Sequence, residues 1–198
     1  MYPDILEKLV SHFKKFPTIG EKSAERLALA TIEMSEEEVA DFSECLLKSK
    51  KTLHPCKQCG SLTDSDICYV CNDEKRNHNL ICVVEDYKSL LSFEKAGNYK
   101  GVYHVLNGLI SPIDNITPQD INLSSLVKRV EKLDNPELIL ALKSSIEGET
   151  TTLYIKKIFE NKNVIISRLS YGIPIGAEID YLDVLTLDKA LSDRKKIS

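Results

Sequence analysis

The stretch CKQCGSLTDSDICYVC, residues 56–71, carries the most informative pattern of the chain: two Cys-x-x-Cys pairs separated by eight residues. Two residues between paired thiolates let one backbone turn present both sulfurs to one metal ion, and two such turns complete a tetrahedral shell. Gly60, directly after the first pair, permits that tight turn. The spacing therefore predicts a structural zinc ion bound by the four cysteines, Cys56, Cys59, Cys68 and Cys71.

Disulfides, a redox pair and an iron–sulfur cluster are the alternatives for these cysteines. A reducing cytoplasm disfavours disulfides, and a redox pair needs only one Cys-x-x-Cys motif. An iron–sulfur cluster stays open, and a colourless purified protein would exclude it. The two remaining cysteines, Cys45 in a predicted helix and Cys82 in an apolar run, are interpreted as small buried hydrophobic residues.

Composition fits a protein with an ordinary hydrophobic core. Of the 198 residues, 42% are hydrophobic and 28% are charged, which suits one domain or two small ones. The apolar runs fall far short of the roughly 20 residues that span a bilayer, and the N-terminal sequence MYPD lacks the pattern of a signal peptide. We therefore expect a cytoplasmic protein without a membrane partner. Its net charge of −4 gives no support for nucleic-acid binding by itself.

The first part of the chain, residues 1–53, has the pattern of a helical region. Apolar residues recur at helical spacing on both sides of the punctuating segment Pro17-Thr18-Ile19-Gly20. A third helix is predicted from Ser35, which has the spacing of a capping box with Glu38. The apolar residues on one face of that helix are Val39, Phe42 and Leu46.

The remaining chain divides into a short polar segment and an α/β region. Residues 54–78 have too few apolar side chains to form a core unaided. From residue 79, unbroken apolar runs alternate with amphipathic stretches, as expected for strands buried on both faces and joined by helices. The sequence therefore predicts a small parallel α/β domain. The apolar runs are residues 80–84, 102–106, 138–142 and 163–166.

The segment 16–27 is similar to a helix-hairpin-helix motif. Unpaired N–H groups at the start of its second helix, beside Gly20, would favour a phosphate, with Lys22 and Arg26 reaching the neighbouring backbone. Thr18 stands where such turns usually have glycine. An ordinary helical hairpin with solvated charges is the alternative. Two groups of lysines are candidates for further phosphate contacts, and an exposed helix face is the equal alternative for both. They are Lys14 and Lys15 before the turn, and Lys48, Lys50, Lys51 and Lys57 nearer the cysteines.

Taken in order, these features resemble the RecR family of bacterial recombination-mediator proteins over essentially the whole chain. After the helical hairpin and the cysteine pairs, four further motifs of that family follow in its order. They are residues 81–85 (ICVVE), 103–112 (YHVLNGLISP), 146–150 (IEGET) and 168–176 (RLSYGIPIG).

The resemblance implies a helix-hairpin-helix region at 1–53, a four-Cys finger at 54–78, a Toprim-type domain at 79–175 and a segment at 176–198 expected in oligomer contacts. It further implies a ring-shaped homo-oligomer that encircles DNA and works with RecO and RecF at gapped or damaged DNA. That partnership helps to load the recombinase RecA. We expect the finger to join the helical and α/β parts.

The positions of the carboxylates argue against an enzymatic function. Toprim enzymes place a Glu after the first strand and an Asp-x-Asp pair after a later one, which together bind magnesium. Glu85 fits the first position, but residues 142–145 (LKSS) supply a lysine and no carboxylate. Ser89 also replaces an Asp that is common in the family. The resemblance assigns Glu85, Glu147 and Glu149 to contact with RecO, and favourable charge at a helix start is the alternative for the last two.

Overall fold

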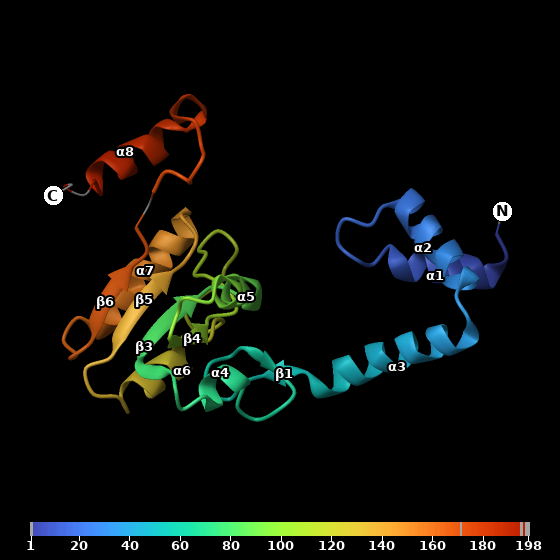
Figure 1. Cartoon of the computed structure of the whole chain (residues 1–198), viewed down its shortest axis with the longest axis horizontal. Helices are drawn as coiled ribbons and strands as arrows, with labels where there is room; N and C mark the ends of the chain where they lie inside the picture. Colours follow the sequence, from blue (N-terminus) through green and yellow to red (C-terminus); the bar gives the residue numbers. More distant parts are fainter. Residues whose placement is uncertain (1, 171, 195, 197–198) are drawn as a thin grey trace. The chain divides into compact units, whose positions relative to one another are not determined.

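The computed structural model describes residues 2–170, 172–194 and 196. Tyr171 of the 168–176 motif, and residues 195, 197 and 198 of the C-terminal segment, lie outside the described residues. The chain divides into two compact units, residues 1–53 and 54–198 (Figure 1). Each is described separately below.

The first unit is helical, as the sequence predicts. It consists of α1 (Asp4–Phe13), α2 (Glu21–Glu33) and α3 (Glu36–Thr52). Its small core lies between α1 and α2, where two alanines without exposed surface let the helices approach closely. The buried residues are Leu6, Val10, Ala24 and Ala28, with Leu9, Phe13 and Ile19 packed against them. Phe16 lies in the turn after α1.

Helix α3 begins with the predicted capping box. The Ser35 hydroxyl accepts a hydrogen bond from the Glu38 N–H at 3.2 Å, and the Glu38 carboxylate accepts one from the Ser35 N–H at 2.9 Å. None of the residues of α3 is buried, however, and Phe42 and Leu46 are 44% and 50% exposed. Cys45 is exposed as well, so its interpretation as a buried hydrophobe is wrong. Helical spacing identifies an apolar face without telling what covers it.

The second unit is built on a four-stranded parallel sheet in the order β4-β3-β5-β6. The strands are β3 (Asn77–Val84), β4 (Gly101–Val105), β5 (Glu137–Ala141) and β6 (Ile165–Arg168), and the intervening helices are α5 (Tyr87–Ala96), α6 (Leu123–Val130) and α7 (Ile146–Phe159). Figure 1 shows these helices packed around the sheet. The predicted parallel α/β domain is confirmed, and Cys82 is buried in β3 as expected.

The last strand differs from its prediction. The apolar run at 163–166 indicated a strand buried on both faces, whereas β6 begins at Ile165, ends at Arg168 and has no buried residue. As the outer strand of the sheet it pairs with β5 alone. An outer strand can therefore be apolar in sequence and still be partly exposed.

The cysteine segment folds as a small finger against the opposite edge of the sheet. It contains β1 (His54–Pro55), β2 (Leu62–Thr63) and the short helix α4 (Tyr69–Asn72). The Val105 N–H of the outer strand β4 donates a 2.7 Å hydrogen bond to the Cys59 carbonyl. The four cysteines belong to the same buried cluster as the sheet residues. The finger thus covers the edge of β4, all five residues of which are buried.

The C-terminal segment contains the 3-10 turn η1 (Ile179–Tyr181) and α8 (Val184–Ser192), with no buried residue among those described. Asp183 caps α8 by accepting a hydrogen bond from the Thr186 N–H at 2.9 Å. No helix in the described parts of the chain is long and apolar enough to cross a membrane.

The hairpin turn between α1 and α2 stores backbone strain. Thr18 has a φ of +68°, in the left-handed region that β-branched residues rarely adopt. Thr18→Gly removes a backbone strain of about 1–2 kcal/mol from the folded state. It also stabilises the unfolded state by about 0.4–1 kcal/mol, because glycine gives the unfolded chain more conformational entropy. We therefore expect the free energy of unfolding to rise by about 0.5–1 kcal/mol, measured by urea denaturation. Thr18→Ala retains a Cβ and should gain less, and a loss of stability in Thr18→Gly would contradict the prediction.

Candidate functional site

The four cysteines converge into one buried cluster. Their sulfur atoms all lie within 4.8 Å of one another, and the Cys59 and Cys68 sulfurs are 3.6 Å apart. Four sulfurs at the usual zinc–sulfur distance in a tetrahedron are about 3.8 Å apart, so the arrangement fits such an ion. Backbone N–H groups of Ser61 and Cys68 point at the Cys59 and Cys56 sulfurs at 3.4 and 3.3 Å. Such donors stabilise thiolates, the form that binds a metal.

The crowding of the thiols itself favours a cation. The hydrogen bond between Cys59 and Cys68 raises the pKa of Cys59 and lowers the pKa of Cys68, so the two groups cannot both ionise readily. A bound divalent cation holds coordinating thiols in their deprotonated form and removes that conflict. The donor set, its burial and its geometry together make a metal site.

Gly60 fixes the first cysteine pair against the α/β domain. Its φ is +76°, and a Cβ at this position would lie 2.4 Å from the Asn122 side-chain nitrogen and 2.8 Å from the Val105 carbonyl oxygen. Only glycine allows this approach. The permissive turn predicted after Cys59 is therefore present, and it brings the finger close to the backbone of β4.

The carboxyl end of the sheet places Glu85 beside a lysine. Glu85 follows β3 and Lys143 follows the neighbouring strand β5, and the Lys143 ammonium lies 3.2 Å from the Glu85 carboxylate. The sequence predicted a lysine close to where cations would gather in a Toprim enzyme. In the described residues, the four cysteines are the one group of three or more His, Cys, Asp or Glu residues whose ligand atoms converge.

Glu147 and Glu149 lie in the first turn of α7. The Ser145 hydroxyl donates to Glu147 at 2.6 Å and holds the pKa of that carboxyl below its usual value. Glu149 lies 3.5 Å from the Arg168 guanidinium and 3.8 Å from the Lys189 ammonium. Three observed contacts thus neutralise or orient the carboxylates that the sequence singled out.

The start of α2 presents its backbone and two cationic side chains. Gly20 is the N-cap of α2, and a Cβ there would meet nothing within 4 Å. Lys22 and Arg26 are both exposed on α2. Lys14 is engaged by Glu21, and the Lys15 ammonium lies 3.4 Å from the His12 ring. Of the four cationic residues around this turn, Lys22 and Arg26 are therefore better placed to meet phosphate than Lys14 and Lys15.

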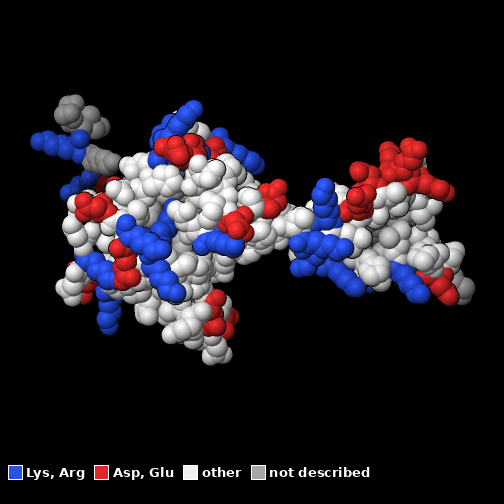
Figure 2. Space-filling model, turned by 90° about the horizontal axis from the view of Figure 1, so that it is seen from below, with Lys and Arg blue, Asp and Glu red and all other residues white. Residues whose placement is uncertain are grey.

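A second group of lysines lies on α3. Lys48, Lys50 and Lys51 fall in its last turns, and Figure 2 shows Lys and Arg side chains gathered over that part of the helix. The opposite end of α3 has three glutamates in its first turn. This distribution follows the helix dipole, which favours anions at the N-terminus and cations at the C-terminus.

Sequence reasoning missed Arg129. In a run such as Lys128-Arg129, charges at the end of a helix indicate a solvated face, yet Arg129 is 8% exposed. One guanidinium nitrogen donates a 2.7 Å hydrogen bond to the Tyr103 carbonyl. No local signal could have found this residue, because its burial depends on a strand 26 residues earlier in the chain.

Comparison with known proteins covers nearly the whole chain. Family models match in order: RecR helix-hairpin-helix at residues 6–49, RecR four-cysteine zinc finger domain at 53–73, Toprim domain at 79–170 and RecR C-terminal at 172–195. Proteins named recombination protein RecR from Staphylococcus aureus strains MRSA252, JH9 and Newman are each 42% identical over 196 residues, which is 99% of this chain and of each relative. The chain belongs to the RecR family.

This membership confirms the predicted fold class, in which a helix-hairpin-helix, a four-cysteine finger and a Toprim domain follow one another. It also supports a role in recombination. The four cysteines lie in the segment that matches the RecR zinc finger model, and the start of α2 lies in the segment that matches the helix-hairpin-helix model. Glu85, Glu147 and Glu149 lie in the segment that matches the Toprim model.

The close contact at Gly60 can be tested by substitution with alanine, with Gly97 as the control position. Gly60→Ala forces a Cβ against the Val105 backbone and should lower the free energy of unfolding by about 3 kcal/mol or more. Gly97→Ala carries a similar φ of +73° but meets open space, so it should cost only about 1 kcal/mol. Urea denaturation of both variants measures the difference. Equal losses would show that the finger does not depend on this approach.

Proposed function

We propose that this RecR-family chain is a non-catalytic DNA-binding clamp and adaptor in recombinational DNA repair. It acts in the cytoplasm with RecO and RecF and helps to load RecA at gapped or damaged DNA. Its working form is a ring-shaped homo-oligomer that encircles DNA. The single observation that carries the proposal is the exposed start of α2, with Lys22 and Arg26, inside a segment that matches the RecR helix-hairpin-helix model.

Contact with DNA is supported by the chemistry of that helix start. Unpaired N–H groups and the positive end of the helix dipole favour a phosphate oxygen, and the unobstructed Gly20 lets a backbone come close. Lys22 and Arg26 lie one turn apart and reach phosphates on either side. Lys14 and Lys15 add positive charge before the turn, although Lys14 first has to leave Glu21. Such contacts position DNA without reading its sequence.

Charge reversal at the helix start tests this surface. Lys22→Glu with Arg26→Glu should weaken binding to gapped DNA and reduce the slope of log affinity against log salt by about 1–2. Fluorescence anisotropy at several salt concentrations gives both quantities. The control is Lys156→Glu with Lys157→Glu, two exposed lysines of α7 that change the net charge equally. An unchanged salt slope in the α2 variant would mean that DNA is bound elsewhere.

Zinc is the metal proposed for the four cysteines, and its role is structural. The buried four-sulfur shell is supported by the match to a four-cysteine zinc finger model. A closed shell of this kind leaves no position for water or substrate. By holding both cysteine pairs, the ion would keep the finger on the edge of β4.

Loss of one ligand should therefore cost both metal and stability. Cys59→Ser should purify with less zinc and lose several kcal/mol of unfolding free energy, measured by atomic emission and chemical denaturation. Cys45→Ser, the same substitution at an exposed cysteine outside the cluster, should change stability by less than about 0.5 kcal/mol. A zinc-depleted Cys59→Ser protein with unchanged melting temperature and oligomeric state would refute the structural role. A brown protein containing iron would identify an iron–sulfur cluster.

Glu85, Glu147 and Glu149 are proposed as the contact surface for RecO. The last two lie in the first turn of α7, where Gly148 brings the helix against the backbone: a Cβ there would lie 1.9 Å from the Lys143 carbonyl oxygen. This packing fixes the first turn of α7, which carries both carboxylates, against the backbone of Lys143. Carboxylates held in fixed positions can exchange their present ion pairs for basic groups of a partner.

Neutralising these carboxylates should weaken the complex with RecO. Glu147→Gln with Glu149→Gln should lower the affinity about tenfold, mainly at low salt, as measured by calorimetry. Glu36→Gln with Glu37→Gln is the matched control, because these residues also occupy the first turn of a helix. Equal losses in both variants would trace the effect to net charge.

The carboxyl end of the sheet also distinguishes the proposed adaptor from the alternative function, a magnesium-dependent Toprim nuclease or topoisomerase. The ion pair between Lys143 and Glu85 occupies the edge where such an enzyme would gather magnesium. We therefore expect the wild-type protein to leave plasmid DNA intact and supercoiled in magnesium. Cleavage or relaxation that Glu85→Gln abolishes would overturn the non-catalytic proposal.

A further inference from the structure

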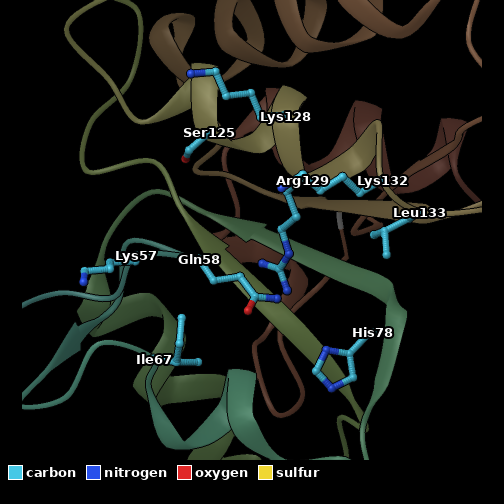
Figure 3. A pocket seen from close by; sticks show the side chains of 9 residues that line it. All are labelled: Lys57, Gln58, Ile67, His78, Ser125, Lys128, Arg129, Lys132 and Leu133. Carbon is cyan, nitrogen blue, oxygen red and sulfur yellow. The ribbon is translucent and has the colours of Figure 1, made fainter.

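A basic cavity of about 510 Å³ lies between the finger and α6, inside the second unit (Figure 3). Its lining includes none of the four cysteines, no residue of α2 and none of Glu85, Glu147 and Glu149. Its walls come from segments far apart in the sequence. The lining residues are Lys57, Gln58 and Ile67 of the finger, His78 of β3, Ser125, Lys128 and Arg129 of α6, and Lys132 and Leu133 after it.

The lining carries four cationic side chains and no carboxylate. Lys57 is paired with the exposed Asp66 at 2.7 Å. The ion pairs within 4.0 Å that are found in the described residues do not include Lys128 or Lys132. A concave surface with one sign of charge concentrates the field and attracts ions of the opposite sign. The cavity is thus suited to an anion.

Arg129 gives the cavity a specific donor. Figure 3 shows its side chain reaching from α6 into the middle of the cavity, towards Gln58. One guanidinium nitrogen, Nη1, is held by the Tyr103 carbonyl. The other, Nη2, is buried and has no hydrogen-bond partner among the described residues. A buried donor without an acceptor is costly, and more so when it is charged, so this nitrogen favours a ligand that brings an oxygen.

We propose that this cavity binds a phosphate-bearing ligand of about the size of a nucleotide. The guanidinium fork of Arg129 matches the geometry of phosphate oxygens, and the exposed Lys128 and Lys132 add positive charge to the lining. The volume falls within the range of small-molecule sites and exceeds what a bare phosphate fills. Ile67 and Leu133 offer apolar contacts for the remainder of the ligand. Two sources share this chemistry: a free nucleotide, and the 5′-phosphorylated end of a DNA strand.

A competing explanation is that the basic residues balance the negative charge of a zinc ion with four thiolates. Arg129 does act electrostatically on Cys71. That explanation accounts for one cation near the cluster. It leaves the unpartnered Nη2, the cavity itself and the exposed Lys128 and Lys132 without a role. The two explanations differ in whether an added phosphate compound binds.

Titration of the zinc-loaded full chain with dTMP, followed by calorimetry, tests the proposal. Saturable binding is expected, and Lys128→Gln with Lys132→Gln should weaken it about tenfold. Arg129→Lys keeps the charge but loses the fork, so it should also weaken binding about tenfold or more. The lysine pair is exposed and its substitution leaves the core intact, so the test stands even if the Arg129 variant folds poorly. Lys156→Gln with Lys157→Gln is the control and should bind normally.

Two single-stranded oligonucleotides, one with and one without a 5′-phosphate, separate the sources. Binding of dTMP together with a preference for the phosphorylated strand assigns the site to nucleotides in both forms. A preference for the phosphorylated strand without dTMP binding assigns it to strand ends. The proposal is overturned if no phosphate compound binds, or if all variants bind equally. Lys22→Glu with Arg26→Glu should retain dTMP binding, so failure of the DNA surface and failure of this cavity are distinguishable.

Discussion

The hydrogen bond between the Val105 N–H and the Cys59 carbonyl connects the two features on which the second unit depends. One partner is the outer strand of the sheet, and the other is the backbone turn that carries the first cysteine pair. The bond requires a residue without a Cβ at position 60 and a turn held in a left-handed conformation. A metal ion that ties this turn to the second pair would thus stabilise the sheet edge as well as the finger.

The Toprim domain places charged side chains of both signs at the carboxyl end of its sheet. Glu85 keeps its place at the carboxyl end of β3, where ligands of parallel sheets bind. The neighbouring strand contributes the ammonium of Lys143, and Glu149 is balanced by Arg168 and Lys189. A site whose negative charges are already balanced attracts magnesium weakly. The same fixed carboxylates remain available to a protein surface, for which geometry matters more than the binding of a metal.

Sequence reasoning succeeded where the cause of a structure is local. The cysteine spacing, the Ser35–Glu38 cap, the parallel strands and the approach of Lys143 to Glu85 follow from neighbours in the chain or from adjacent strand ends. It failed where the outcome depends on distant elements. The apolar face of α3 and Cys45 are exposed, and β6 has a strand neighbour on one side only. Arg129 is buried and bonded to β4. Periodicity identifies which side chains share a face, but burial is decided by what packs against that face.

The two edges of the sheet differ, and this difference limits how copies of the domain can join. The β4 edge is covered by the finger, whereas β6 has one strand neighbour and exposes Ile165. A sheet with two open edges can extend without end, as fibres do. A sheet with one open edge can accept a single neighbour, which closes the pair by two-fold symmetry. The finger thus removes one of the two edges through which strands of separate copies could pair.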